Sequence, residues 1–319
     1  MSIVSQRLVL EVNAHIAAWH KGMYCLNGTT GTDNQNTNDA VQPLYQFNKS
    51  DWWFHHYNLC DQFPPAPGDF LDLPANGQFT VELATNRAFT TLSNNGTKVA
   101  LYGDGLDHPN LGDGVEGTTG NNTCITSPNI HTRNESMASG TVFAISYVSD
   151  LKEVTESNLV VFSVLYNTPW QRLATYSVPN LPACPEPGGC ICSWGWVPNG
   201  CGVANMYMLP YRCRVTGQTG ASAVAPGKAP VWCEDDPTKC VGGAKQMVFW
   251  HQLEGNNVVV SGSDLAGNPK SPTYNLKMGF SNGAQMDIFL DSGPAETTSI
   301  DLAAPATTLT SITPLPVQT

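Results

Sequence analysis

Charged residues are scarce in this chain, and positive ones are the scarcest. Only 13% of the 319 residues are charged, and 15 Lys and Arg stand against 26 Asp and Glu, which gives a formal net charge of −11. Nucleic acids and anionic membranes are bound through basic surfaces that release counterions, and the composition provides none. We therefore expect no nucleic-acid and no membrane partner; a neutral or weakly charged partner fits better.

Long apolar runs and several familiar catalytic motifs are also missing. No stretch of 18 or more apolar residues occurs, so we expect no membrane-spanning helix. The sequence has no P-loop, no GxGxxG borne on a strand and no GxSxG nucleophile elbow. Hydrolysis by two carboxylates leaves no local signature, so a glycoside hydrolase stays open, although a pair such as Asp69 and Asp72 in an acidic protein is more typical of solvated surface acids.

Helical periodicity is nearly absent, whereas turn residues are abundant: the chain has 29 Gly and 23 Pro. Short β-branched or aromatic runs recur between turn residues. They are "FTVEL" from Phe79, "GTVFAISYV" from Gly140, "NLVVFSVLYN" from Asn158, "KQMVFWHQL" from Lys245 and "NNVVVSG" from Asn256. The pattern predicts an all-β protein, an antiparallel β-sandwich with long loops.

Ten cysteines, an even number, are accompanied by five N-glycosylation sequons. Together they favour a secreted, oxidised glycoprotein. The cluster Cys184, Cys190, Cys192 and Cys201 lacks the paired CxxC of a zinc ribbon, so we interpret it as disulfide-bridged loops whose pairing the sequence leaves open. Cys233 and Cys240, around a polar turn, are the one local pair we predict. The expected glycosylation sites are Asn27, Asn48, Asn95, Asn121 and Asn134.

The two ends of the chain differ from its body. Residues 1–14, "MSIVSQRLVLEVNA", contain Arg7 and Glu11 within an apolar stretch, which we interpret as an atypical or truncated signal segment. Residues 15–290 form one domain in this interpretation. Residues 291–319 are rich in Ser, Thr, Pro and Ala and lack aromatics, which predicts a disordered or O-glycosylated tail.

His15 follows Val-Asn-Ala, an end that a signal peptidase accepts. If it becomes the first residue, its α-amine and ring Nδ1 can chelate one metal ion, and a second imidazole would complete three nitrogens, an arrangement that suits copper. The other six histidines form no HExxH or HxH motif. His55 and His56 are adjacent, and in a strand they would face opposite sides, so we do not expect them to share a metal.

These features accompany a resemblance to the fungal lytic polysaccharide monooxygenases. The segments that carry it resemble auxiliary activity family 14: "HIAAWHKGMYCLNGTTGT", "SDWWFHH", "CDQFPPAPGDFLDLP", "CITSPNIHT", "NTPWQRL", "CICSWGWVPNGCG" and "KAPVWCEDD". The resemblance implies an immunoglobulin-like β-sandwich that holds one copper ion in a histidine brace with an axial tyrosine. It also implies a flat surface where a polysaccharide binds. Members of the family are described as oxidising xylan bound to cellulose.

Carried over to this chain, the resemblance places the metal ligands and catalytic residues at His15, His131 of "SPNIHT" and Tyr207 of "NMYMLPYRC". Asn205 stands where related enzymes more often have glutamine. His108 is a rival ligand, in an acidic Gly-rich loop over 101–122. Tyr211 is a rival axial residue, although we expect Pro210 to break the strand between the two tyrosines. Candidates for aromatic stacking are Trp19, Trp52, Trp53 and Trp196.

The implied function is that of a secreted, monomeric, copper-dependent monooxygenase that cleaves plant cell-wall polysaccharide oxidatively. Its partners would be the xylan or cellulose surface, an external electron donor, and dioxygen or hydrogen peroxide. The alternative is a non-catalytic secreted protein that binds copper or carbohydrate on the same fold, because a fold alone does not confer oxidative chemistry.

Overall fold

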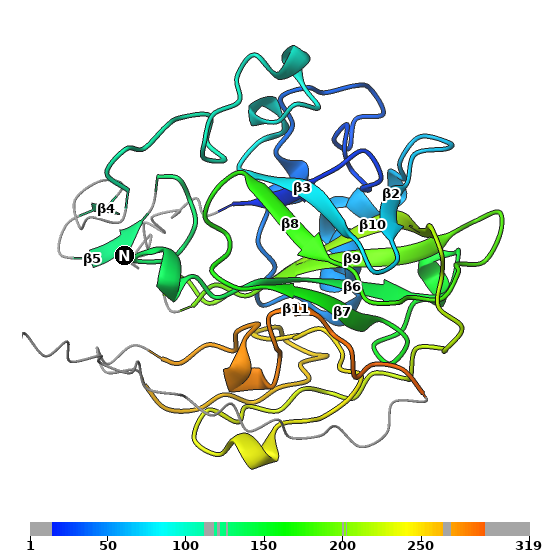
Figure 1. Cartoon of the computed structure of the whole chain (residues 1–319). Helices are drawn as coiled ribbons and strands as arrows, with labels where there is room; N and C mark the ends of the chain where they lie inside the picture. Colours follow the sequence, from blue (N-terminus) through cyan, green and yellow to red (C-terminus); the bar gives the residue numbers. More distant parts are fainter. Residues whose placement is uncertain are drawn as a thin grey trace, which may run out of the picture.

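Two stacked β-sheets form the body of the protein (Figure 1). A computed structural model describes residues 15–111, 118–119, 122–125, 127–199, 201, 203–263 and 269–290. A three-stranded sheet has the order β1-β3-β8, a six-stranded sheet has the order β11-β7-β6-β9-β10-β2, and β4 pairs only with β5. Neighbouring strands are antiparallel except for β10 and β2, which are parallel. The prediction of an all-β sandwich is confirmed.

The strands are short and separated by long connections. Their bounds are β1 Ala17–Trp19, β2 Leu71–Pro74, β3 Gln78–Ala84, β4 Thr118–Thr119, β5 Asn122–Ile125, β6 Thr141–Ser146, β7 Val160–Leu165, β8 Leu173–Ser177, β9 Cys190–Trp196, β10 Tyr207–Thr216 and β11 Gly283–Ala284. The runs predicted from Phe79, Gly140 and Asn158 thus correspond to β3, β6 and β7.

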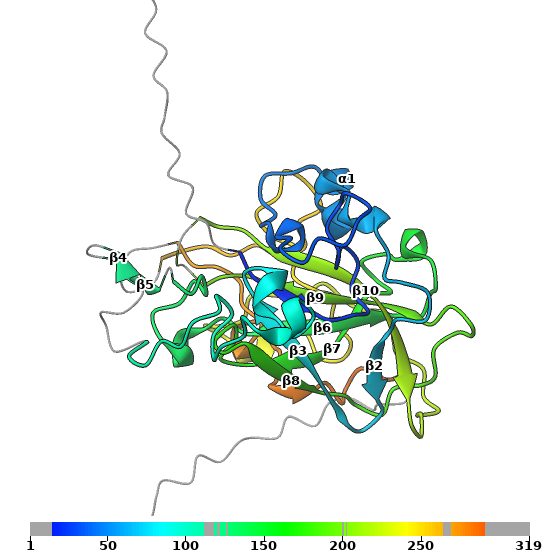
Figure 2. The same ribbon diagram turned by 90° about the horizontal axis from the view of Figure 1, so that it is seen from above.

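Helical segments are confined to the connections. There is one α-helix, α1 Lys49–Trp52, among the residues described. The 3-10 turns are η1 Asp39–Val41, η2 Trp53–Asn58, η3 Cys60–Gln62, η4 Arg87–Phe89, η5 Asn94–Gly96, η6 Glu135–Met137, η7 Leu151–Glu153, η8 Pro237–Lys239 and η9 Leu276–Met278. Seen from above, α1 lies to one side of the sheets, and the η2 turn that follows it packs beside β10 (Figure 2). Within the described ranges no helix is long and apolar enough to cross a membrane.

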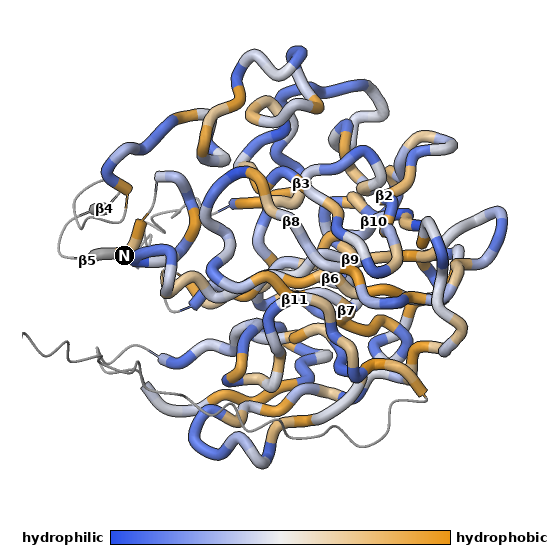
Figure 3. The backbone as a smooth tube through the Cα atoms, viewed as in Figure 1, coloured by the Kyte–Doolittle hydropathy of each residue, from blue (hydrophilic) through white to orange (hydrophobic). Residues whose placement is uncertain are grey.

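The six-stranded sheet is buried on both faces. One face packs against the three-stranded sheet through side chains such as Phe143, Phe162 and Trp194. The other face, including Val142 and Val161, is covered by loops from residues 44–57 and 245–280. All six side chains of β6 are therefore buried, and hydrophobic segments gather along this sheet and the loops below it (Figure 3).

The apolar cluster between the outer face of the six-stranded sheet and these loops forms a second core, which explains two wrong predictions. The runs from Lys245 and Asn256 form no regular strand; they lie among the irregular loops beneath the sheet. Met247, Val248, Phe249 and Val258 are buried in the second core. These residues are apolar because they pack against the outer face of the sheet, not because their segments form strands of it.

One local prediction was also wrong. Pro210 does not interrupt β10, because its carbonyl accepts the Tyr24 N–H at 3.0 Å and its nitrogen faces the same way, away from β9. A proline there removes no hydrogen bond between β9 and β10. His55 and His56 lie in η2 rather than in a strand, with His55 buried and His56 half-exposed.

Five disulfides pair all ten cysteines. Cys233 and Cys240 are bonded, which confirms the one predicted pair. The cluster after residue 184 divides between a local bridge and two longer ones. The remaining bonds are Cys25–Cys60, Cys124–Cys201, Cys184–Cys190 and Cys192–Cys213.

Candidate functional site

His131 lies in the connection between β5 and η6, and its backbone is unusual. Its φ is +46°, in the left-handed region that costs a non-glycine residue about 1–3 kcal/mol. Neighbouring hydrogen bonds hold the loop: the Ile125 N–H donates to the Thr132 carbonyl at 2.8 Å, and the Thr132 hydroxyl donates to the Asn134 carbonyl at 2.8 Å. A strained, well-anchored histidine is typical of a functional position.

The ring of His131 is oriented by one contact. Its Nδ1 contacts the carbonyl oxygen of Cys201, a residue that is bonded to Cys124 in β5. Since a carbonyl only accepts, Nδ1 carries the proton and Nε2 presents a lone pair. Nε2 is buried and has no hydrogen-bond partner among the described residues. Burial lowers the pKa of His131 to about 4, so the imidazole is neutral, the form that binds a metal ion.

His15 lies close to His131. It precedes β1 directly, is half-buried, and its Nδ1 is enclosed within the protein. After burial and the Cys201 contact, the charge of His15 is a further influence on the pKa of His131, which it lowers. The structure thus brings together two imidazoles that are 116 residues apart in the chain.

Tyr207 reaches the same region through Trp196. Its ring stacks on that indole with centroids 4.7 Å apart, and the His131 ring meets the same indole edge-on at 5.7 Å. The two strands fix this arrangement because Trp196 of β9 pairs directly with Tyr207 of β10. Burial raises the pKa of Tyr207 well above its ordinary value, so the phenol stays protonated.

Asn205 lies just before β10 and is buried. Its side-chain N–H donates to the Val203 carbonyl at 2.9 Å, and its Oδ1 is buried with no partner in the described part of the chain. This hydrogen bond from the side-chain nitrogen holds the Asn205 amide in one orientation. Its role in the candidate site stays a prediction.

The rival residues are engaged elsewhere. His108 pairs through Nε2 with the Asp104 carboxylate at 2.7 Å and packs edge-on against Tyr102. The Tyr211 hydroxyl donates to the Ala18 carbonyl inside the core. Part of the 101–122 loop, residues 112–117 and 120–121, lies outside the described residues.

The donor set fits copper better than it fits a metal that needs many ligands. Among the residues described, no three His, Cys, Asp or Glu side chains converge on one point. Two imidazoles, one protonated phenol and the amine that His15 would have as a first residue are nitrogen-rich and suit a tetragonal Cu(II) site. The ligand roles of His15, His131 and Tyr207 themselves remain predictions.

The expected stacking platform was largely wrong. Trp19, Trp52 and Trp196 are at most 1% exposed, because each lies in a segment packed into one of the two cores or against the candidate site. Trp53 is half-buried, with the Lys49 ammonium 5.2 Å from its ring centroid. Sequence reasoning missed Trp232 and Arg133, which line a cavity beside His131. The position of Arg133, two residues after a candidate ligand, was the available signal.

Four of the five sequons fall on described residues. Asn27, Asn48 and Asn95 are exposed, and Asn134 is half-buried where its side chain caps η6. Asn121 lies outside the described residues. Whether any of them carries a glycan remains a prediction.

The described residues define a disulfide-stapled all-β protein that gathers two imidazoles and a buried phenol at one end of its sandwich. A sequence model of one family, lytic polysaccharide monooxygenase AA14, matches residues 1–318, a wider span than the segments quoted above. The chain belongs to this family. Monooxygenases are oxidoreductases, so the predicted enzyme class agrees with the family.

Curated relatives agree with this assignment. The chain is 35% identical over 295 residues to AA14 family lytic polysaccharide monooxygenase B of Trametes coccinea (strain BRFM310). This match covers 88% of this chain and 64% of that protein. It is 36% identical over 290 residues to the B enzyme of Talaromyces rugulosus, covering 87% and 93%. It is 33% identical over 324 residues to the B enzyme of Pycnoporus cinnabarinus, covering 95% and 79%. The chain therefore spans just under two thirds of the first of these relatives.

Proposed function

We propose that the protein is a copper-dependent monooxygenase that cleaves polysaccharide oxidatively, with His15, His131 and Tyr207 as its metal ligands. The observation that carries the proposal is the buried Nε2 of His131, which lies close to His15 and has no hydrogen-bond partner among the described residues. A buried nitrogen lone pair without a donor is costly unless another group, here a metal ion, satisfies it.

Each of these residues has a defined part. His131 stays neutral because it is buried, and the Cys201 carbonyl fixes its tautomer. Tyr207 stays a neutral phenol, so it adds a weak oxygen donor without adding negative charge. His15 supplies a ring nitrogen and, as a first residue, an amine. Copper, when bound, supplies the redox chemistry that uses dioxygen or hydrogen peroxide and an external electron donor to remove hydrogen from a sugar carbon.

The substrate we propose is plant cell-wall polysaccharide, xylan bound to cellulose, attacked by a secreted, monomeric, glycosylated enzyme. The family and its relatives' names support the general class of substrate. Five disulfides and three exposed sequons support an oxidising, extracellular setting. Paired carboxylates for hydrolysis are less favoured, because Asp72 is engaged by Arg214 at 2.6 Å.

The decisive experiment varies the residue before His15. A form that begins at His15 is compared with a form that carries one extra residue, whose peptide nitrogen cannot act as an amine ligand without losing its proton. We expect far weaker Cu(II) binding and no oxidised saccharides from the extended form. Equal copper affinity of the two forms would refute the brace.

Product analysis separates the enzyme from a non-catalytic relative. The form that begins at His15, loaded with copper and supplied with ascorbate, should form hydrogen peroxide and release saccharides with the masses of oxidised sugars. Copper binding without oxidised products would support the alternative, a copper-binding or carbohydrate-binding protein on the same fold. Products with the masses of hydrated sugars alone would indicate a hydrolase.

A further inference from the structure

A cavity of about 750 Å³ lies directly beside His131. Thr132 and Arg133, the next two residues of the chain, line it, and so does Cys201, whose carbonyl contacts the His131 ring. Two residues of chain span at most about 7 Å, so the cavity begins next to the proposed metal ligand. Its volume is within the range of about 300–1,000 Å³ that small-molecule sites occupy.

One wall of the cavity is a fixed charged cluster around Trp232. The Glu234 carboxylate accepts hydrogen bonds from Lys270 at 2.7 Å and pairs with Lys277 at 2.8 Å. Both ammonium groups lie over the Trp232 ring, 5.7 and 6.0 Å from its centroid. The lysines lower the pKa of Glu234, so this carboxylate stays charged and engaged with them.

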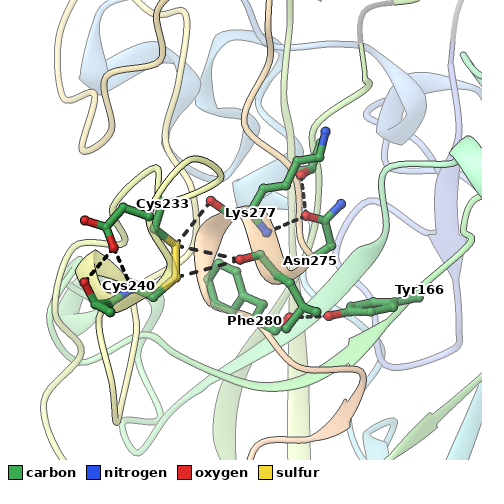
Figure 4. Close-up of a disulfide and its surroundings, with 10 residues drawn as sticks. Tyr166, Cys233, Cys240, Asn275, Lys277 and Phe280 are labelled. Atoms are coloured by element: carbon green, nitrogen blue, oxygen red, sulfur yellow. Dashed lines mark hydrogen bonds between the residues drawn. A yellow bond between two sulfur atoms is a disulfide. The ribbon is translucent and has the colours of Figure 1, made fainter. Parts of the chain in front are cut away.

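The cluster is held in place by the Cys233–Cys240 disulfide (Figure 4). The Cys233 N–H donates to the Lys277 carbonyl at 2.8 Å, and the Cys233 sulfur contacts the same oxygen at 3.4 Å. The segment that carries Trp232 and Glu234 is therefore fastened to η9, which carries Lys277. A wall held in this way is preorganised for a ligand.

Arg133 differs from the lysines because it has no counter-ion among the residues that the structure describes. No carboxylate of the described residues pairs with it, and its Nε is buried without an acceptor. Glu234 is committed to two lysines, and the other carboxylate of the cavity, Asp235, is exposed. Three cations and two carboxylates line the cavity, an excess of positive charge in a chain with a net charge of −11.

A half-buried guanidinium with no counter-ion in the described part of the chain favours one kind of ligand. Its planar fork matches the two oxygens of a carboxylate, which it can bind in a bidentate manner. Trp232 adds an aromatic surface of the kind against which sugar rings pack. The cavity therefore combines a recognition group for a carboxylate with a contact surface for a sugar, beside the proposed oxidation site.

We propose that this cavity is a subsite for a uronyl group, the carboxylate-bearing sugar of an acidic polysaccharide. The inference rests on the proposed function, which supplies both the polysaccharide ligand and the metal site beside the cavity. Arg133 binds the carboxylate, Trp232 contacts the ring, and Lys270 adds positive charge nearby. The subsite would place the neighbouring backbone sugar at the metal site, so it would select acidic regions of the polymer.

The test measures binding without turnover. Copper-loaded protein that begins at His15, without a reductant, is titrated by calorimetry with a uronyl-substituted xylo-oligosaccharide and with the same oligosaccharide lacking the uronyl group. We expect the acidic ligand to bind about tenfold more tightly or better, since a hydrogen-bonded charged pair contributes this much. Arg133→Gln should remove the difference and leave the neutral ligand unaffected, whereas Arg214→Gln, an equal charge change at Asp72, should preserve it.

Each outcome decides the inference. Equal affinity for the two oligosaccharides, or a preference that survives Arg133→Gln, overturns the subsite. Free glucuronate that binds as tightly as the oligosaccharide would also overturn it, because the cavity would then accept small carboxylates in general. If Arg133→Gln does not fold, Arg133→Lys replaces it and should weaken the preference by loss of the bidentate contact. Oxidised products from neutral xylan with no uronyl preference would remove the subsite and retain the proposed function.

Discussion

His131 presents its Nδ1 to the carbonyl oxygen of Cys201, and the side chain of Cys201 is bonded to Cys124 in β5. The disulfide therefore fixes the residue that orients the proposed ligand, on the same strand that leads into the ligand's own loop. A structural crosslink at this position should affect the metal site as well as the stability of the fold.

Removal of this disulfide should lower copper affinity. We expect the double variant Cys124→Ala/Cys201→Ala to bind Cu(II) about 10–100-fold more weakly, the usual cost of losing a partner that orients a metal ligand. Closing a loop with a sequence separation of 77 also contributes about 4 kcal/mol to stability, so affinity must be measured at a temperature where the variant is folded. Competition with a copper chelator gives the affinity.

The matched control is the Cys184–Cys190 bridge, which ends at the start of β9, far along the strand from Trp196. Its sequence separation of 6 predicts a smaller stability loss, about 2 kcal/mol. Cys184→Ala/Cys190→Ala should keep the copper affinity of the unaltered protein. A similar loss of affinity in both double variants would show that the effect is general destabilisation.

The choice between His131 and His108 can be tested by substitution. His131→Ala should reduce copper affinity by at least about 100-fold and abolish saccharide oxidation, because it removes one of the three expected nitrogens. His108→Ala removes a ring already engaged by Asp104 at 2.7 Å and should leave the Cu(II) paramagnetic resonance spectrum unchanged. The opposite pattern of losses would transfer the ligand role to His108.

Tyr207 and Tyr211 form a second matched pair, since both are buried phenols on β10. Tyr207→Phe should change the Cu(II) spectrum and lower turnover while the fold is kept, because the stacking on Trp196 needs only the ring. Tyr211→Phe loses a hydrogen bond to Ala18, which should cost about 1 kcal/mol of stability and leave the spectrum as it was. An unchanged spectrum for Tyr207→Phe would assign the axial position to another group.

Local patterns predicted β3, β6 and β7, three strands whose neighbours are also strands, but did not single out β8 or β9. They failed where burial had another cause, as in the segment from Lys245, whose Phe249 covers the outer face of the six-stranded sheet. A single sequence cannot distinguish the two origins of an apolar run. The same limit applies to Trp196, which looked like a surface platform and instead packs between His131 and Tyr207.

The candidate site was named through resemblance rather than through spacing. No local motif joins His15, His131 and Tyr207, because three separate segments meet only in the folded sandwich. For disulfides the same distinction holds: Cys233–Cys240 closes a short turn that can be recognised in the sequence, whereas Cys124–Cys201 joins distant loops. Arg133 escaped notice because its position in the cavity, without a counter-ion among the described residues, is a property of the folded protein.

The stability of the copper-free protein should decrease in mild acid, in part because of His55. This side chain is fully buried in η2, neither ring nitrogen has a partner in the described part of the chain, and burial lowers its pKa from 6.5 to about 3. Between these two values the unfolded chain binds one proton more than the folded chain at this residue. The contribution of His55 to the free energy of unfolding is therefore complete above pH 6.5. It is lost, by about 1.4 kcal/mol per pH unit, as the pH falls toward 3.

His55→Asn tests this directly, because asparagine does not titrate and tolerates the left-handed backbone at this position, where φ is +60°. We expect the variant to be less stable at pH 7, since it leaves a small cavity, but to lose stability less steeply between pH 6.5 and 4.5. Denaturant unfolding at several pH values, with the disulfides intact and copper removed by a chelator, gives the slopes. His56→Asn, the same substitution at the half-exposed neighbour beside Asp61, is the matched variant with which the slope is compared. If His55→Asn keeps the full slope, His55 is not the group that takes up the proton on unfolding. The loss of stability in acid then comes from other groups, such as the half-buried His20, whose pKa burial lowers to about 4.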